Sequence, residues 1–296
     1  MWQPLLDMDG ATLATVALKA FACLASLTAA GSALALASLA SLDRDTGRMV
    51  GRLGLACAVA AGLASAALIP VGAIYLAGGS WTGAVDPALT GMVAASPVGE
   101  SLVVRIAGLA VVAVLFVSGK APGPAAVAGA GIVCVSFAFR GHVLAEPRLI
   151  LGALITAHLL GLAFWIGAFA PLHRMAGRAD PSRTGAVAAE FGRWALWVVP
   201  ALAAAGVTLL VLLAGNPLDA VGTTWGRLLA VKLVVFVLLL GLAAYNRLRL
   251  TPALLAGDIG AGVLLRRSIR LEFAAVSVIL AVTAVLTTIA SPDMEG

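Results

Sequence analysis

Charged residues are scarce in this sequence, which contains 11% charged and 61% hydrophobic residues over a length of 296. A soluble domain carries about 25% charged and roughly 45–50% apolar residues, so the composition excludes a soluble globular protein. A membrane-spanning helix requires about 20 predominantly apolar residues, which leaves room for about eight such helices joined by short loops. Because little length remains for a separate soluble module, we expect a single all-α membrane domain over residues 1–296.

The motifs of several enzyme and cofactor classes are also absent. The three cysteines, Cys23, Cys57 and Cys134, each stand alone in an apolar stretch, so they provide no disulfide framework and no CxxC or CxxCH haem-attachment motif. The sequence contains no P-loop, no HExxH zinc motif and no GxSxG nucleophile elbow. We therefore expect a protein that is not an enzyme and in which any transport is driven by gradients or ligand exchange.

The segment before the first apolar stretch differs from a cleaved signal peptide. It reads MWQPLLDMDG and contains Asp7 and Asp9 where a signal peptide has Lys or Arg. The apolar stretch 11–42 is also far longer than the roughly 7–15 residues of a signal h-region. We expect this stretch to remain as the first membrane helix.

Glycine, proline and charged residues divide the apolar sequence into eight stretches. These stretches should be helical, because lipid offers no hydrogen-bond partner to the backbone and the stretches are too long and uniformly apolar for barrel strands. The expected spans are 12–42, 51–77, 98–119, 123–141, 149–173, 186–214, 226–249 and 265–290. We expect residues 78–97 to form the longest loop, with room for a short re-entrant segment, and residues 174–185 to form a polar linker.

The distribution of basic residues predicts the orientation of the bundle. One side contains thirteen of the 19 basic residues and six acids, among them Glu272, whereas the opposite side contains six basic and eight acidic residues. The positive-inside rule places the first side in the cytoplasm and both termini on the outer side. The net charge of +5 therefore reflects topology in a lipid bilayer, and nucleic acid is not an expected partner.

The sequence has three histidines at different expected depths. His142 ends the fourth span on the outer side, and His158 lies about ten residues, or roughly 15 Å, inside the fifth span. A polar residue near the midplane favours a functional role for His158, although an interhelical hydrogen bond that fixes packing would also explain it. His142 either binds a ligand or simply faces water, and His173 is expected among lipid headgroups. Two histidines at one depth are needed for a bis-histidine haem in the membrane centre, so haem is not expected there, although a shallow site near His142 stays open.

Soft and acidic side chains accompany the histidines in the outer segments. Imidazole binds copper, zinc, iron or nickel, and thioethers select Cu(I), so methionines on this side are candidate copper ligands, although nearness to chain ends explains their positions equally well. Arg105, about seven residues inside the third span, should pair with a carboxylate such as Glu100 or line a water-filled vestibule. The candidate metal ligands are His142, His158, Glu146, Glu100, Met92 and Met294.

Five segments of the second half carry a more specific pattern. RGHVLAEP with His142 is followed by AHLLGLAFWIGAFAPL with His158, and then by WGRLLAVKLVVFVLLLGLAAYNRLRLTP, LLRRSIRLE and AVLTTIASP. Together these segments resemble the copper-resistance D (CopD/PcoD) membrane proteins, in which the first two segments hold paired histidines. The resemblance covers about residues 140–292, whereas residues 1–139, with the first four spans, show only the hydropathy of membrane helices.

The resemblance implies a copper-handling protein of the bacterial inner membrane, which moves copper from periplasm to cytoplasm and contributes to copper resistance. It also implies a partnership with a small periplasmic copper carrier of the CopC type, and in such a membrane the termini that the positive-inside rule places outside are periplasmic. His142 and His158 correspond to the two histidines of the family, although Val143 follows the Gly-His pair where family members often have Ala.

These expectations define a path for copper with few ligands at each step, as conduction requires. Copper would be captured near His142, with Glu146, Glu100 or methionines assisting, would pass to His158, and would leave near His173 and Met175. Two other functions stay open at this point. One is a redox module that carries haem or passes electrons between quinone and periplasmic copper, and the other is a scaffold that only docks a periplasmic copper protein.

Overall fold

The computed structural model describes residues 8–118, 123–178, 180–214 and 223–288, without the side chains of His142, Val143 and Ala214. Within these ranges the chain is helical and has no strand. The long helices are α2 (Gly10–Ser38), α3 (Arg44–Leu76), α5 (Pro97–Ser118), α7 (Arg148–Met175), α8 (Pro181–Ala214), α9 (Thr224–Tyr245) and α11 (Ile259–Leu286). The short elements are η1 (Trp81–Val85), α4 (Pro87–Ala94), α6 (Pro124–Val135), η2 (Ser136–Phe139), η3 (Gly141–Leu144), the π-helical η4 (Asn246–Leu250) and α10 (Thr251–Leu255).

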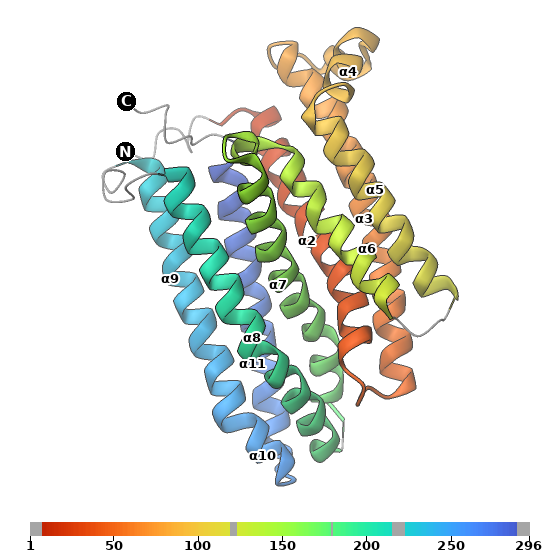
Figure 1. Cartoon of the computed structure of the whole chain (residues 1–296), viewed down its shortest axis with the longest axis vertical. Coiled ribbons are helices and arrows are strands. Elements are labelled where there is room, and N and C mark those ends of the chain that lie inside the picture. The colour runs from red at the N-terminus through yellow and green to blue at the C-terminus, as the bar shows by residue number, and fades with distance from the viewer. Residues whose placement is uncertain (1–7, 119–122, 179, 215–222, 289–296) are drawn as a thin grey trace.

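Seven of the described helices are long and apolar enough to cross a membrane, if α9, η4 and α10 are taken as one segment, Thr224–Leu255. They run side by side as a bundle (Figure 1). The fourth expected span corresponds to the shorter apolar helix Pro124–Phe139, formed by α6 and η2, whose length is about 25 Å. A bilayer core is about 30 Å thick, so this helix is shorter than a full span. The expected all-α multi-pass membrane fold is confirmed, with seven long helices and this short one.

Three helices begin earlier than expected, because their aspartate caps lie outside the apolar stretches. α3 begins at Arg44 rather than residue 51, and Asp43 accepts a hydrogen bond from the Thr46 N–H at 2.9 Å. α11 begins at Ile259 rather than residue 265, and Asp258 caps it in the same way. α8 begins at Pro181 rather than residue 186, so the polar linker is shorter than expected. An N-terminal carboxylate satisfies helix N–H groups that would otherwise lack partners.

The segment expected as the longest loop is mostly helical. Residues 78–97 contain η1 and α4, and Asp86 caps α4 by accepting hydrogen bonds from the N–H groups of Ala88 and Leu89. Proline in the first turn of α4 fits this start, since proline lacks the N–H that would be unpaired there. Figure 1 shows α4 at one end of the bundle, beyond the ends of α3 and α5.

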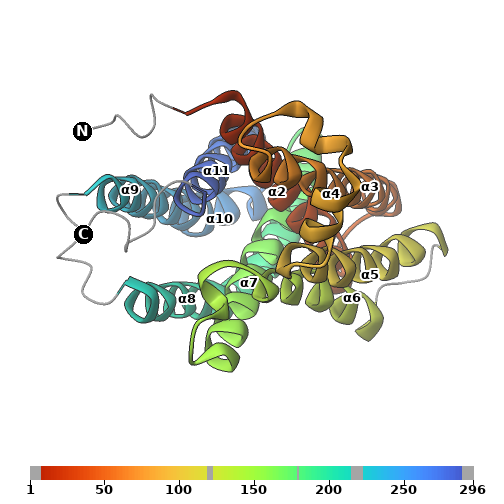
Figure 2. The ribbon, with the colours of Figure 1, turned by 90° about the horizontal axis from the view of Figure 1, so that it is seen from above.

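α2 occupies the centre of the bundle although it is the first described helix of the chain. It packs against α3, α5, α6, α7 and α11, and 56% of its most apolar window is buried, compared with 11% for the α9–α10 segment. In Figure 2, α9 and α8 lie at one side of the bundle and α3 and α5 at another. The outer helices therefore present most of the apolar side chains that face lipid, while α2 exposes few large ones, Leu13 and Phe21.

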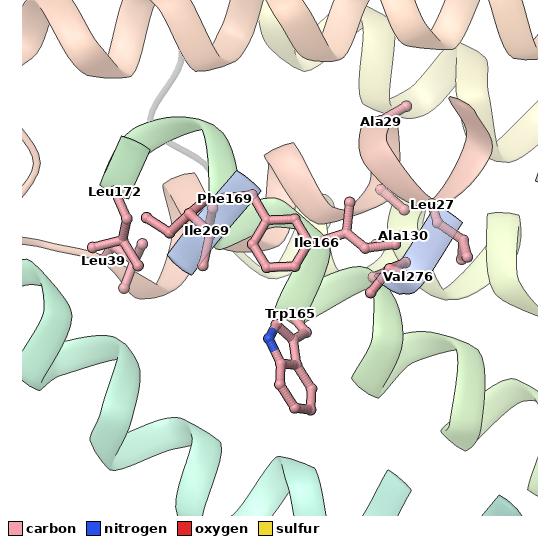
Figure 3. Packing of buried hydrophobic residues seen from close by; sticks show 14 of the residues in the cluster. Leu27, Ala29, Leu39, Ala130, Trp165, Ile166, Phe169, Leu172, Ile269 and Val276 are labelled. Atoms are coloured by element: carbon pink, nitrogen blue, oxygen red, sulfur yellow. The ribbon is translucent and has the colours of Figure 1, made fainter. Parts of the chain in front are cut away.

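Small residues allow α2 and α7 to touch backbone to backbone. A Cβ atom on Gly31 would lie 2.1 Å from the Ala163 carbonyl oxygen, and one on Gly167 would lie 2.0 Å from the Gly31 oxygen. Membrane helices lack a hydrophobic driving force for association and rely on such close packing. Leu27, Ile166 and Phe169 lie in the buried cluster at this interface (Figure 3). This contact fixes the position of α7, which holds two of the functional side chains described below.

Polar contacts tie together the helices at the arginine-rich end of the bundle. Glu190 of α8 accepts hydrogen bonds from the N–H groups of Ala40 and Ser41 at 2.9 and 3.0 Å. Asp43 forms an ion pair of 2.7 Å with Arg178. Burial disfavours the Asp43 carboxylate, but hydrogen bonds from Thr46 and Arg178 outweigh this effect and hold its pKa below its ordinary value.

Candidate functional site

His158 projects from α7 toward α8 and is half-buried between the two helices. It lies ten residues, or about 15 Å, from the Arg148 end of α7. Its Nδ1 atom lies 2.9 Å from the Leu202 carbonyl oxygen of α8. Because a carbonyl oxygen only accepts hydrogen bonds, Nδ1 must carry the proton, which leaves the lone pair on Nε2. Metal-binding histidines commonly donate their second ring N–H to a backbone carbonyl in this way. His158 therefore has the tautomer that a metal ligand requires.

Two glycines make room for this imidazole between α7 and α8. A Cβ atom on Gly206 would lie 3.0 Å from His158 Cε1 and 3.1 Å from Nδ1. A Cβ atom on Gly161 of α7 would lie 3.0 Å from Leu202 Cβ. Both distances are shorter than ordinary van der Waals contacts, so the ring and the Leu202 carbonyl depend on the absence of side chains at these positions.

The other candidate ligands gather at one end of the bundle without forming a compact group. Met92 is exposed on α4, and Glu100 is exposed in the first turn of α5. Glu146 is exposed before α7, and its Oε2 accepts a hydrogen bond of 3.2 Å from the Arg148 N–H. The backbone of His142 lies in η3. α4 and the connection from α6 to α7 lie at the same end of the bundle (Figure 1).

The side chains of two candidate ligands are not described, since Met294 lies outside the described residues and His142 is described by its backbone alone. Among the described side chains, no three His, Cys, Asp or Glu residues form a group that could hold a metal. An outer copper-capture site therefore stays a prediction.

At the opposite, arginine-rich end, a pocket of about 440 Å³ opens among α3, α7 and α11. Its lining includes the Met49 thioether and the His173 imidazole, together with the guanidinium groups of Arg174 and Arg266. His173 lies fifteen residues beyond His158 on the same helix, about 22 Å away. The pocket thus combines soft ligands with groups that bind anions. Met175 is buried and does not line it.

Arg105 has a different environment from the one expected. It does not pair with Glu100 among the described ion pairs, and its side chain is only 1% exposed. Its three guanidinium nitrogens each donate to a serine hydroxyl at 3.0–3.2 Å, on Ser65, Ser101 and Ser136. Its Cζ atom lies 4.0 Å from the centroid of the Phe137 ring. The carboxylate partner and the water-filled vestibule were both wrong predictions, and Arg105 instead joins α3, α5 and η2.

A second buried polar cluster surrounds Glu272 of α11. Trp165 Nε1 donates to Glu272 Oε2 at 3.0 Å, and Asn246 Nδ2 donates to Glu272 Oε1. Ser268 lies one turn earlier on the same face of α11. Figure 3 shows the Trp165 side chain pointing away from Phe169 and Ile166. This cluster lies between α7, α11 and the π-helical segment η4.

Comparison with known families accounts for most of the chain. Residues 185–286 match the family model described as copper resistance protein D, and residues 8–148 match the model described as the copper resistance protein D-like N-terminal domain. The chain belongs to the copper resistance protein D family. Neither a curated protein nor a solved structure matches it.

Membership in the copper resistance protein D family connects the protein with copper resistance, and the long apolar helices make it a multi-pass membrane protein. The match over residues 8–148 includes α2, α3, α5 and α6, where sequence motifs had shown only hydropathy. Residues 149–184 lie between the two matches and contain most of α7, including His158 and Trp165. The arrangement around His158 is thus described by this structure rather than by either family model.

Sequence patterns missed the Glu272 cluster of this copper resistance protein D family member. Glu272 was counted among the acids of the cytoplasmic side, although the expected span 265–290 contains it. The structure instead places it midway along α11. The buried positions Ala261, Leu265, Ser268, Glu272 and Val276 follow one another at helical spacing, which indicates a single buried face. This periodicity was the available signal.

Proposed function

We propose that this protein moves copper ions across the bacterial inner membrane from periplasm to cytoplasm and thereby contributes to copper resistance. The observation that carries the proposal is the His158 imidazole, which lies inside the bundle with its Nδ1–H bonded to Leu202 and its Nε2 lone pair available. Imidazole is a suitable ligand for copper ions, and a single imidazole binds weakly enough to allow release. Family membership supplies the identity of the metal.

The order of donors along the bundle supports a path. Met92, Glu100 and Glu146 lie at the end that the positive-inside rule assigns to the periplasm. His158 lies about 15 Å farther along α7, and the pocket with Met49 and His173 lies at the arginine-rich end. We propose that copper enters from a periplasmic carrier of the CopC type at the first end. It passes His158 and leaves through the pocket.

Copper influx into proteoliposomes tests the proposal. Wild-type protein should admit copper, and His158→Ala should abolish the influx while the protein elutes as a folded species in detergent. His158→Gln separates the two roles of the side chain, because its amide N–H can still donate to the Leu202 carbonyl but it provides no imidazole. Loss of influx in both variants supports a ligand role. Unchanged influx in His158→Ala refutes the path.

Two further outcomes address the other functions. Full influx in His158→Gln with loss in His158→Ala would show that the imidazole acts only in helix packing. Absence of influx in folded wild-type protein would refute transport. An absorption spectrum of the same sample would then show a Soret band if the protein is a haem-containing redox module.

A further inference from the structure

The carboxyl group of Glu272 is enclosed among neutral groups in the bundle interior. Glu272 is only 4% exposed and lies 13 residues from the first residue of α11 and 14 from its last. Both carboxyl oxygens accept hydrogen bonds, Oε2 from Trp165 and Oε1 from Asn246. Neither of the two ion pairs among the described residues includes it. A buried carboxylate without a cation is strongly disfavoured, so this group needs a compensating positive charge or a proton.

Within the described part of the chain, two buried polar atoms near Glu272 have no hydrogen-bond partner. Among the described residues, three buried side-chain polar atoms have no hydrogen-bond partner, and two of them are Asn246 Oδ1 and Ser268 Oγ. Ser268 is 5% exposed and lies four residues before Glu272 on the same helix face. Buried polar groups in native proteins almost always have partners, and an amide oxygen can only accept, so Asn246 Oδ1 lacks a donor beside this buried acid.

The backbone at Asn246 is also unusual. Residues Asn246–Leu250 form a π-helical turn between α9 and α10. Thr251 satisfies the Asn246 carbonyl oxygen with both its backbone N–H and its hydroxyl group, the latter at 2.9 Å. π-helical turns are rare and occur frequently at functional sites. Here the turn places the Asn246 amide against Glu272.

The charged groups of the surrounding elements are engaged elsewhere. Arg247 donates to the Gly192 carbonyl oxygen, Lys19 to the Thr287 oxygen, and Glu190 accepts from Ala40 and Ser41. His158 contacts Leu202. His173 and Arg266 line the pocket at the arginine-rich end of the bundle. Four other arginines are exposed, namely Arg193, Arg249, Arg267 and Arg270. Lys232 is 14 residues from Asn246, about 21 Å along the helix. Cys23 and Tyr245 provide a thiol and a phenol rather than a cationic group. No described cation is therefore paired with Glu272.

We propose that Glu272 is a proton-binding site and that its proton is exchanged as copper passes, so that the proton is the coupling ion of transport. A proton on Glu272 removes the unpaired buried charge, while the Trp165 and Asn246 N–H groups still donate to the carboxyl oxygens. A metal ion is less suitable, because Trp165 and Asn246 already direct N–H donors at the carboxyl oxygens.

The coupling part of this proposal rests on the proposed function. His158 and Trp165 are seven residues apart on α7, which places them on one helix face about 10 Å apart. Copper that leaves His158 toward the pocket therefore passes the level of Glu272. Its positive charge disfavours the bound proton, which leaves Glu272 toward the periplasmic side as the copper ion approaches. Glu272 takes up a proton again from the cytoplasmic side after the ion has gone, so that copper entry is exchanged for proton exit.

Infrared difference spectroscopy of the reconstituted protein tests the proton site without copper. The pH is varied from about 5 to about 9, since buried carboxyl groups can hold a proton up to about pH 8–9. We expect a band from a protonated, buried carboxylic acid that is absent in Glu272→Gln. The matched control is Glu190→Gln, which removes a second buried glutamate but should leave the band. If the spectra of wild type and Glu272→Gln show the same carboxylic-acid bands, the proton site is refuted.

A second variant keeps this test independent of the folding of Glu272→Gln. Trp165→Phe removes the Nε1–H donor and leaves the carboxyl group in place. The carbonyl of the protonated acid then loses one hydrogen bond, so its stretching band should move to higher frequency. A band that stays at the wild-type frequency would contradict its assignment to Glu272.

Proteoliposomes that contain a pH-sensitive dye test the coupling. Copper influx through the wild type should raise the internal pH, and this change should disappear in Glu272→Gln but persist in Glu190→Gln. Copper influx through the wild type without a pH change would refute coupling. Absence of copper influx in the wild type would instead refute the proposed function, and the infrared result would still decide whether Glu272 binds a proton.

Discussion

Gly206→Ala offers a graded test of the His158 site, because it adds one methyl group beside the ring. The new Cβ atom would lie 3.0 Å from Cε1 and 3.1 Å from Nδ1, so the imidazole must retreat by a few tenths of an ångström. Gly206 and the Leu202 carbonyl belong to the same helix, and the retreat therefore stretches the hydrogen bond of 2.9 Å. Such a bond is worth about 1 kcal/mol, and loss of the group that orients a metal-binding histidine reduces metal affinity about 10–100-fold.

The assay is copper influx into proteoliposomes as a function of copper concentration. Gly206→Ala should raise the half-saturating concentration about tenfold or more, with little change in the amount of folded protein. The matched control is Gly241→Ala in α9, where a Cβ atom meets nothing within 4 Å. Both substitutions add the same helix propensity, about 0.8–1.0 kcal/mol, so they differ only in contact with His158. Equal half-saturation in the two variants would refute the ligand role of the hydrogen-bonded imidazole.

Two further predictions concern stability, measured by thermal unfolding in detergent. Gly31→Ala should destabilise the protein by about 1–3 kcal/mol, because its Cβ atom would lie 2.1 Å from a backbone oxygen of α7 that cannot move without separating the helices. The control is Gly62→Ala, whose Cβ atom would meet nothing within 4 Å and which should not destabilise the protein. Equal melting temperatures of Gly31→Ala and Gly62→Ala would disprove the backbone contact. Asp43→Asn should be less stable than wild type at pH 7, because the lowered pKa of Asp43 adds stability above the unfolded value of about 3.9. This stability is lost as the pH falls through the folded pKa, so the two curves should converge below about pH 4, and a constant difference would contradict the assignment.

Much of the fold could be predicted because the bilayer constrains the chain so strongly. Long apolar stretches must become helices in lipid, and the seven long helices lie where these stretches were expected. The helix starts were less predictable, because an apolar stretch ends at the first charged residue whereas a helix can continue through charged residues. Arg44 and Arg48 belong to α3 although they lie outside the expected spans, because Asp43 caps that helix farther out.

The candidate site was predictable only in part, for a related reason. The depth of His158 followed from counting residues along an apolar stretch. Polar residues near the midplane of a membrane are rare and often functional, which made His158 a candidate. Its partners, Leu202 and Gly206, lie on another helix, and no pattern within one helix indicates which neighbour it packs against. Glu272 was missed because nearby arginines dominate the local sequence, and only the face that it shares with Ser268 distinguishes it from a surface acid.

The central position of α2 has a consequence for how the chain assembles. α2 precedes α7 and α11 in the chain, yet it packs against both. The face of α2 that contains Gly31, which contacts α7 in the complete bundle, therefore has no partner when α2 first enters the membrane. A fragment that ends after residue 148 would display this bare face, although it contains a complete family match. Such a fragment should bind the remainder of the chain when the two are produced together. The bundle is therefore completed only when the later helices α7 and α11 have packed around α2.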